Sequence, residues 1–327
     1  MRILVCGGAG YIGSNMTALL AAEGHEPVVF DNFSKGHRAA VRNVEIIAGD
    51  LADYDLLLQT LRGRGIDAVM HFAAWIEVGE SVQEPLKYYR NNTSNTQNLL
   101  SAMEAAGVGR FVFSSTAAVY GMPETTPITE EMPKAPINPY GESKWAVERM
   151  CHYQSQAGRL HYAALRYFNA CGAGNNGLCG EDHRPESHLI PLTIQAAMGK
   201  RADIKIYGTD YDTPDGTCIR DYIHVDDLCR AHLLALGKLD ERPEQVYNLG
   251  NGQGYSVREV IETVRQVSGR DFKIVETNRR PGDPAVLTSD ASKARRELGW
   301  TCQKAELETM VATAWQWHSE HPNGYSD

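Results

Sequence analysis

The chain has 327 residues, of which 43% are hydrophobic and 22% are charged, close to the averages of globular proteins. Its length exceeds that of a usual single core, so we expect two domains or one enlarged α/β domain. The formal net charge of −9 argues against nucleic-acid and anionic-membrane partners, since both favour a basic surface. With no run of 18 apolar residues and no signal-peptide pattern, we expect a cytoplasmic protein.

The seven cysteines are odd in number, and the sequence contains no CxxC motif. Cys171 and Cys179 lie eight positions apart, a spacing that matches no metal-binding signature. We therefore expect reduced structural thiols and no metal site.

The first 32 residues predict a dinucleotide-binding unit. Residues 3–6 have the pattern of a buried strand and residues 11–23 that of a helix. Gly7 and Gly10 fall between them, and Gly13 falls in the first turn of the helix. Glycines at these spacings allow a tight turn, close approach of a pyrophosphate and packing of helix on strand. The next strand, 28–30, ends at Asp31, which can accept a hydrogen bond from a ribose 2′-hydroxyl and repels a 2′-phosphate. NAD is therefore favoured over NADP, although the positive charges of Lys35 and Arg38 oppose that preference.

Strands and helices then alternate as far as residue 167. Expected strands lie at 45–48, 68–72, 111–114 and 162–167, and expected helices at 51–61, 85–106 and 138–156. This alternation predicts a doubly wound parallel α/β sheet, a Rossmann fold. A glycine-rich loop follows residue 168, after which short elements mix, and 246–249 predicts one more strand of the first sheet. We predict an NAD-binding domain of residues 1–170 plus a returning segment of about 222–250. Residues 171–221 and 251–327 are predicted to form a smaller α/β substrate domain.

The stretch "NPYGESKWAVERM" begins the expected helix at 138. Asn138 is a suitable N-cap and Pro139 suits the first helical position. Tyr140 and Lys144 then share one face at i and i+4, and both the ammonium and the helix dipole favour phenolate. A useful base near neutrality requires lowering the phenol pKa by roughly 3 units, which is too much for one exposed lysine, and a further positive charge such as an oxidised nicotinamide would help.

These motifs together carry a resemblance to a known family. The glycine pattern, Tyr140-x-x-x-Lys144 and "FSSTAAVYG" resemble the extended short-chain dehydrogenase/reductase superfamily. The segments "LRYFN", "RDYIHVDDL", "YNLGNG" and "RRPGDPA" resemble those of UDP-glucose (UDP-galactose) 4-epimerases, and the shared segments span nearly the whole chain.

The resemblance implies roles for individual residues. Tyr140 is the implied acid/base, Lys144 the group that lowers its pKa and Thr116 the proton relay. The residues implied in cofactor binding are Gly7, Gly10, Tyr11, Ile12, Gly13, Asp31, Asn32, Asp50, Leu51, Phe72, Ala73, Ala74, Asn91, Ser114, Tyr140, Lys144 and Tyr167. The residues implied in binding a UDP-sugar are Thr116, Tyr140, Phe168, Asn169, His188, Leu189, Tyr207, Arg220, Tyr222, Arg280, Asp283 and Leu287.

Some positions depart from the family pattern. Ile76 stands where many relatives have a lysine beside the cofactor, and His188 replaces an asparagine near the sugar. Leu287 stands where some relatives have a bulky tyrosine that blocks N-acetylated sugars, so some turnover of UDP-N-acetylhexosamines is expected.

Other functions remain open from the sequence. A 4,6-dehydratase of this superfamily carries a carboxylate pair after the catalytic threonine, where this chain has Ala117 and Ala118. A plain NAD-dependent nucleotide-sugar dehydrogenase is a further alternative, and a non-catalytic dinucleotide sensor usually loses the tyrosine or lysine. The strongest alternative is an epimerase of another nucleotide sugar, UDP-GlcNAc/GalNAc, UDP-xylose or UDP-glucuronate. The resemblance also implies a homodimer formed through helices 85–106 and 138–156.

Overall fold

The computed structural model describes residues 1–174, 177–280 and 282–326. Residues 175 and 176 of the glycine-rich loop and residue 281 of the "RRPGDPA" segment lie outside the described residues. None of the described helices is both long and apolar enough to cross a membrane.

The larger part of the fold is built on a seven-stranded parallel sheet, with the strand order β3-β2-β1-β4-β5-β6-β11. Its strands are β1 (Arg2–Cys6), β2 (Glu26–Asp31), β3 (Glu45–Ala48), β4 (Ala68–His71), β5 (Arg110–Thr116), β6 (His161–Tyr167) and β11 (Glu244–Leu249). The order reverses between β1 and β4, so a crevice opens beyond the carboxyl ends of these two strands. The predicted doubly wound parallel sheet is confirmed, and so is the late strand, which pairs with β6.

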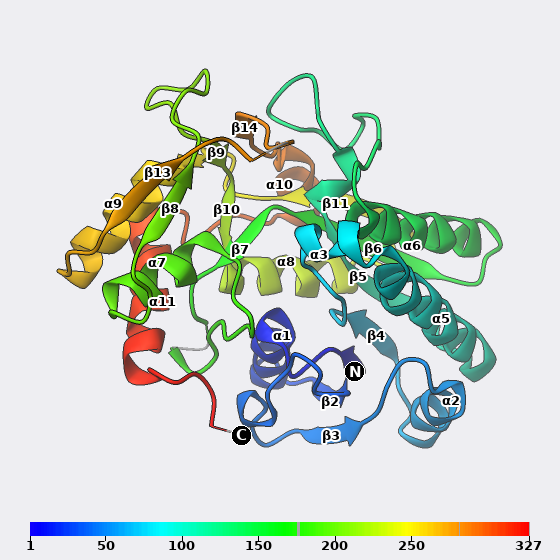
Figure 1. Ribbon diagram of the computed structural model, residues 1–327. Helices are drawn as coiled ribbons and strands as arrows, with labels where there is room; N and C mark the ends of the chain where they lie inside the picture. The colour runs from blue at the N-terminus through cyan, green and yellow to red at the C-terminus, as the bar shows by residue number, and fades with distance from the viewer. Residues whose placement is uncertain (175–176, 281, 327) are drawn as a thin grey trace.

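Helices cover both faces of this sheet (Figure 1). On one face are α1 (Tyr11–Ala22), α8 (Val225–Gly237) and α10 (Ser292–Leu298). The other face carries α2 (Tyr54–Gly63), α5 (Asn95–Ala106) and α6 (Pro139–Gln156). The central strands β1 and β4 are mostly apolar and buried, as expected for a parallel sheet covered on both sides.

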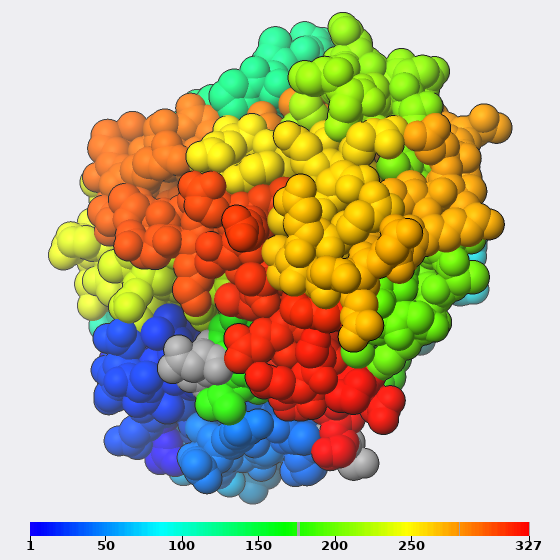
Figure 2. All heavy atoms as spheres, turned by 90° about the vertical axis from the view of Figure 1, so that its left-hand side faces the viewer, coloured from blue at the N-terminus to red at the C-terminus, as the bar shows by residue number. Residues whose placement is uncertain are grey.

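The later part of the chain adds a second core beside the large sheet. It is built on α7 (Leu189–Ala197), α9 (Val257–Ser268) and α11 (Leu307–Glu320). Three small sheets join them: β7 (Asn169–Cys171) with β10 (Tyr222–His224), β8 (Ile204–Tyr207) with β13 (Ile274–Thr277), and β9 (Ile219–Arg220) between β12 (Tyr255–Ser256) and β14 (Val286–Leu287). In Figure 2 the segments coloured yellow and orange cover the upper part of this face, and the red C-terminal residues lie beside the blue N-terminal residues. The domain boundaries given above stay a prediction.

Two helices differ from their predicted bounds. The helix predicted at 51–61 begins at Tyr54, because the Asp53 carboxylate accepts a hydrogen bond from the Leu56 N–H and caps it. The single helix predicted at 85–106 is three segments: α4 (Pro85–Tyr88), a π-helical turn η2 (Tyr89–Ser94) and α5. Short segments complete the described chain: α3 (Val78–Gln83), η1 (Arg38–Ala40) and η3 (Ala117–Tyr120).

The helix predicted from Asn138 is confirmed together with its cap. Asn138 Oδ1 accepts a hydrogen bond from Gly141 N at 2.9 Å, and Pro139 takes the first helical position. All seven cysteines are free, as predicted, and six of them are buried.

Candidate active site

A cavity of about 890 Å³ lies at the crevice beyond β1 and β4. It is lined by residues of the large sheet and of the second core, so both parts of the chain contribute walls. The volume is near the upper end of the range for small-molecule sites.

The glycine turn forms one wall of the cavity. A Cβ atom on Gly7 would lie 2.4 Å from Ala73 N, and one on Gly13 would lie 2.0 Å from Gly7 O, so neither position has room for a side chain. Gly10 has only Gly7 O at 3.4 Å, which leaves its outer side open to the cavity. Gly10 is also the N-cap of α1 and makes no side-chain cap, so the first amides of the helix remain available to an anion. This arrangement fits a pyrophosphate.

Asp31 lies at the end of β2 where the ribose of a dinucleotide is expected. Its two carboxylate oxygens accept hydrogen bonds from Ala9 N at 2.9 Å and Phe33 N at 2.8 Å, and each keeps further acceptor capacity. Burial raises the pKa of Asp31, and these two hydrogen bonds act against the rise. Lys35 Nζ donates to Arg184 O, and the Arg38 guanidinium lies over the Phe33 ring. Both cations that opposed the preference for NAD therefore have protein partners.

Asn32 and Asp50 extend this end of the cavity. Asn32 Nδ2 donates to Asp50 Oδ2 at 2.7 Å, and Asp50 Oδ1 accepts from Ala52 N at 2.8 Å. The other predicted cofactor residues also line the cavity: Tyr11, Ile12, Leu51, Phe72, Ala73, Ala74, Asn91, Ser114 and Tyr167. Asn91 lies in the π-helical turn, where its Nδ2 donates to Asn92 Oδ1 at 2.9 Å.

The three predicted catalytic residues come together in the same cavity from β5 and α6. Thr116 Oγ1 accepts from Ala118 N at 3.1 Å, which caps the turn after β5. Lys144 is buried, and its Nζ donates to Ser114 O at 2.8 Å. The lack of water around the ammonium lowers the pKa of Lys144 to about 7.

The chain without its cofactor does not lower the pKa of Tyr140, and the lowering expected with a further positive charge stays a prediction. Desolvation of the phenol raises this pKa, a hydrogen bond with Thr116 lowers it by less, and the negative charge of Glu77 raises it further. The hydrogen bond that the structure gives to Lys144 goes to the Ser114 carbonyl. The phenol is therefore protonated, and this chain alone does not supply the charge that would ionise it.

Two guanidinium groups border the other end of the cavity. Arg220 Nη1 donates to Ile219 O and Pro284 O, both at 2.9 Å, and its Nη2 lies 3.6 Å from Asp283 Oδ1. Arg280 lies 3.8 Å over the ring of Tyr207. In a chain of net charge −9, these two cations offer a local positive charge that can bind an anion.

The remaining predicted substrate residues divide into two groups. Phe168, Asn169, His188, Arg220, Arg280, Asp283 and Leu287 line the main cavity. Leu189 and Tyr222 instead line a small adjoining cavity, and Tyr207 lies beneath Arg280. The direct contact of these three residues with a substrate stays a prediction.

The sequence prediction considered only Ile76 of the segment 75–82, which does line the cavity, and missed the rest of this segment and three residues of the loop before α7. Trp75, Glu77, Val78, Gly79 and Val82 line the cavity, as do Glu181, His183 and Ser187. Asn92 fixes the first of these segments, because its side chain accepts from Trp75 N at 2.9 Å and donates to Trp75 O at 3.0 Å. The sequence signal was an asparagine pair, Asn91–Asn92, of which only the first was considered.

Residues 3–250 match the family described as the NAD dependent epimerase/dehydratase family. The chain belongs to this family. A UDP-glucose 4-epimerase of Halalkalibacterium halodurans is 51% identical over the whole of this chain and 98% of its own length. A crystal structure of a UDP-glucose 4-epimerase is 48% identical with a TM-score of 0.98 and full coverage of both chains. The UDP-glucose 4-epimerase of Brucella ovis in complex with NAD is 46% identical, with a TM-score of 0.94 over 97% of this chain and 98% of that one.

Membership confirms the resemblance drawn from the motifs, including that the chain is an enzyme and that NAD is its cofactor. The glycine turn, the open amides of α1 and Asp31 fit this dinucleotide.

Proposed function

We propose that the protein is a UDP-glucose 4-epimerase that interconverts UDP-galactose and UDP-glucose through a 4-keto intermediate. The observation that carries the proposal is a single cavity bordered by the dinucleotide turn, by Tyr140 and Thr116, and by the guanidiniums of Arg220 and Arg280. The names of the full-length relatives support it.

In this proposal Tyr140 takes the proton of the sugar 4-hydroxyl, and Thr116 relays it between sugar and phenol. NAD, when bound, supplies the hydride acceptor and a positive ring charge beside the phenol. Lys144, held by the Ser114 carbonyl, adds a second cation once it is protonated. These charges lower the pKa of Tyr140 from the raised value that the chain alone gives it.

The two arginines hold the diphosphate, which anchors the nucleotide while the oxidised sugar turns about its phosphate link. The hydrogen then returns to the other face of C4. The cycle consumes no oxidant, so the cofactor can stay bound between turnovers.

The alternative reactions require different side chains in the cavity wall. Where a dehydratase has an acid/base carboxylate pair, the methyl groups of Ala117 and Ala118 line the wall. Methyl groups cannot eliminate water, so we disfavour this reaction. An epimerase of another UDP-sugar stays the second candidate, because Leu287 leaves more room than a tyrosine at the sugar end.

The proposal also includes a cytoplasmic homodimer. The expected interface has support in exposed apolar side chains: Leu86 of α4 is 76% exposed and Tyr153 of α6 is 62% exposed. Both lie on the helices that the resemblance implies. Analytical sedimentation of the purified chain tests this, and a monomer would contradict it.

The direct test is incubation of the purified protein with UDP-galactose, without added dinucleotide, followed by identification of the product. We expect UDP-glucose. An absence of any conversion, even after NAD is added, would overturn the proposal.

A further inference from the structure

A His/Glu cluster lies at the edge of the cavity, on the loop that precedes α7. It consists of Glu181, His183, Glu186 and His188, and one ligand atom from each lies within 4.8 Å of all the others. The sequence predicted no metal site because only cysteine spacing was considered. The pattern E-x-H-x-x-E-x-H was the signal available in the sequence.

Most of the distances within the cluster are close to those between the ligands of a small cation. The Nδ1 atom of His188 lies 2.6 Å from Glu181 Oε1 and 3.4 Å from Glu186 Oε1. The Nδ1 atom of His183 lies 3.1 Å from Glu181 Oε1 and 3.8 Å from Glu186 Oε2. A tetrahedral zinc site with bonds of about 2.0–2.1 Å has ligand–ligand separations of about 3.4 Å. Three of the observed distances lie close to this value, and the contact of 2.6 Å between His188 and Glu181 must lengthen when a metal binds.

Three of these atoms lack a well-formed hydrogen bond. Glu181 Oε1, His183 Nδ1 and His188 Nδ1 are buried, and among the described residues none has a partner with hydrogen-bond geometry. Glu181 as a whole is only 5% exposed. Their contacts are the ion pairs with one another given above, in which the atoms are not aligned as hydrogen bonds, so the same atoms are free to bind one cation between them.

Backbone N–H groups fix the position of the Glu186 carboxylate. Its Oε1 accepts hydrogen bonds from Ser187 N at 2.7 Å and from His188 N at 2.8 Å. On the other side, the ring of His183 meets the ring of Tyr11 edge-on, with the centroids 6.3 Å apart. Such supporting contacts fix ligand side chains at metal sites and limit how far they can move.

We propose that Glu181, His183, Glu186 and His188 form a binding site for a divalent transition-metal ion, with Zn²⁺ as the best match. Two imidazole nitrogens and two carboxylate oxygens are zinc ligands, whereas Mg²⁺ and Ca²⁺ prefer oxygen alone. Glu181, His183 and His188 also line the cavity, so the ion can enter from there. The site needs no UDP-sugar, and its test does not depend on the proposed function.

The test is a titration of the holoenzyme with ZnCl₂ by calorimetry, in wild type and in His183→Gln. We expect one Zn²⁺ per chain in the wild type and binding at least about tenfold weaker in the variant, which loses one of four ligands. His152→Gln is the matched control, because His152 makes a similar ion pair with Glu244, at 2.7 Å, away from the cavity. This control should bind zinc as the wild type does.

A second measurement needs no variant. In crystals soaked with ZnCl₂, anomalous diffraction at the zinc edge should place a peak about 2.0–2.2 Å from the four ligand atoms. The proposal is overturned by failure of the wild type to bind zinc, by equal affinity in wild type and His183→Gln, or by a peak elsewhere on the chain.

Discussion

The local sequence pattern around Tyr140 favours a lower pKa of its phenol, whereas burial in the folded chain raises that pKa. The i,i+4 spacing to Lys144 and the helix N-terminus were correctly identified from the sequence, because both depend on a few neighbouring residues. The desolvation that raises the pKa of Tyr140 in the chain alone was not predictable, because it comes from parts of the chain distant in sequence. The positions of chemical groups were thus predictable, but not how deeply each group is buried.

Replacing Tyr140 by phenylalanine removes the phenol and keeps the ring. We expect turnover to fall by roughly two to four orders of magnitude, the usual range for an acid/base group, while UDP binding survives. Steady-state assay and calorimetry with UDP measure the two effects. Tyr153→Phe, an exposed tyrosine on the same helix, is the control and should keep full activity. Near-normal turnover of Tyr140→Phe would overturn the assignment.

Leu287 sets the room at the sugar end of the cavity. It lies in β14 and packs with Phe168 against the cluster of Val119, Tyr120 and Ile128. We expect the wild type to turn over UDP-GlcNAc, and Leu287→Tyr to lower kcat/KM for UDP-GlcNAc at least about tenfold more than kcat/KM for UDP-galactose. No detectable wild-type activity on UDP-GlcNAc would remove the idea.

At the scale of elements, a buried ion pair joins the strands and the helix that carry the catalytic groups. Arg166 of β6 binds Glu148 of α6 through its Nε at 2.9 Å, and both side chains are almost fully buried. Ser115 of β5 also donates to Glu148, and Arg166 Nη1 donates to the hydroxyl of Tyr120 at 2.8 Å. The pair therefore fixes α6 against β5 and β6, beside Thr116 and Lys144.

Replacing Glu148 by glutamine leaves the Arg166 charge buried without its partner. We expect this to reduce the free energy of unfolding by about 3–5 kcal/mol, the usual cost of breaking a buried pair. Arg110→Met breaks an exposed pair with Asp240 and should cost less than about 1 kcal/mol. Urea unfolding measures both, and an equal loss in the two variants would contradict the role given to Glu148.

The bounds of a helix could be predicted from the sequence only where neighbouring residues determine them. The start of α6 was predicted correctly because its cap lies within four residues. The break at Tyr89–Ser94 was missed, since apolar periodicity and the absence of glycine or proline favour one helix. The break depends on distant contacts instead: Asn92 binds the backbone of Trp75 and donates to Ser143 Oγ at 3.1 Å.

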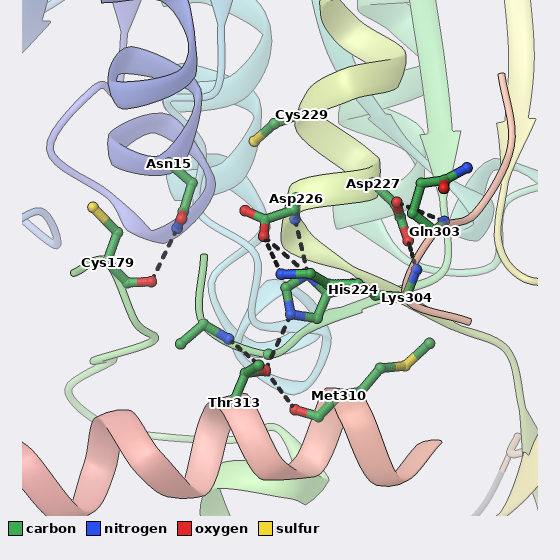
Figure 3. A network of polar contacts seen from close by, with 12 residues as sticks. Asn15, Cys179, His224, Asp226, Asp227, Cys229, Gln303, Lys304, Met310 and Thr313 are labelled. Carbon is green, nitrogen blue, oxygen red and sulfur yellow. Dashed lines mark hydrogen bonds and ion pairs between the residues drawn. The ribbon is translucent and has the colours of Figure 1, made fainter. Parts of the chain in front are cut away.

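At the scale of the whole molecule, a polar network ties the second core to α8. Figure 3 shows His224 between Asp226 and Thr313. His224 Nε2 lies 3.0 Å from Thr313 Oγ1 of α11, and Lys304 Nζ donates to Asp226 Oδ2 at 2.6 Å. The late parallel strand β11 was predictable from its apolar run, but these single side-chain contacts between distant segments were not.

His224 makes stability depend on pH. Burial is the main cause that lowers its pKa to about 4, with Asp226 and Lys304 acting in opposite directions. Below pH 6.5 His224 binds a proton in the unfolded chain, whereas in the folded chain it binds this proton only near pH 4. The free energy of unfolding therefore falls as pH decreases through this window, by up to about 1.4 kcal/mol per pH unit from this group.

Urea unfolding of wild type and His224→Gln between pH 7 and 4.5 tests this contribution. The slope of stability against pH should be smaller in the variant by up to about 1.4 kcal/mol per unit. Equal slopes would contradict it. His232, whose pKa burial also lowers to about 4, should keep part of the slope in both proteins.

The central claim is that one cavity removes the hydrogen from C4 of the sugar and returns the same hydrogen to the opposite face. The most direct measurement is conversion of UDP-galactose by the purified protein in D₂O, with the product examined at C4 by NMR. We predict UDP-glucose without deuterium at that carbon. Stoichiometric deuterium at C4 would contradict the account.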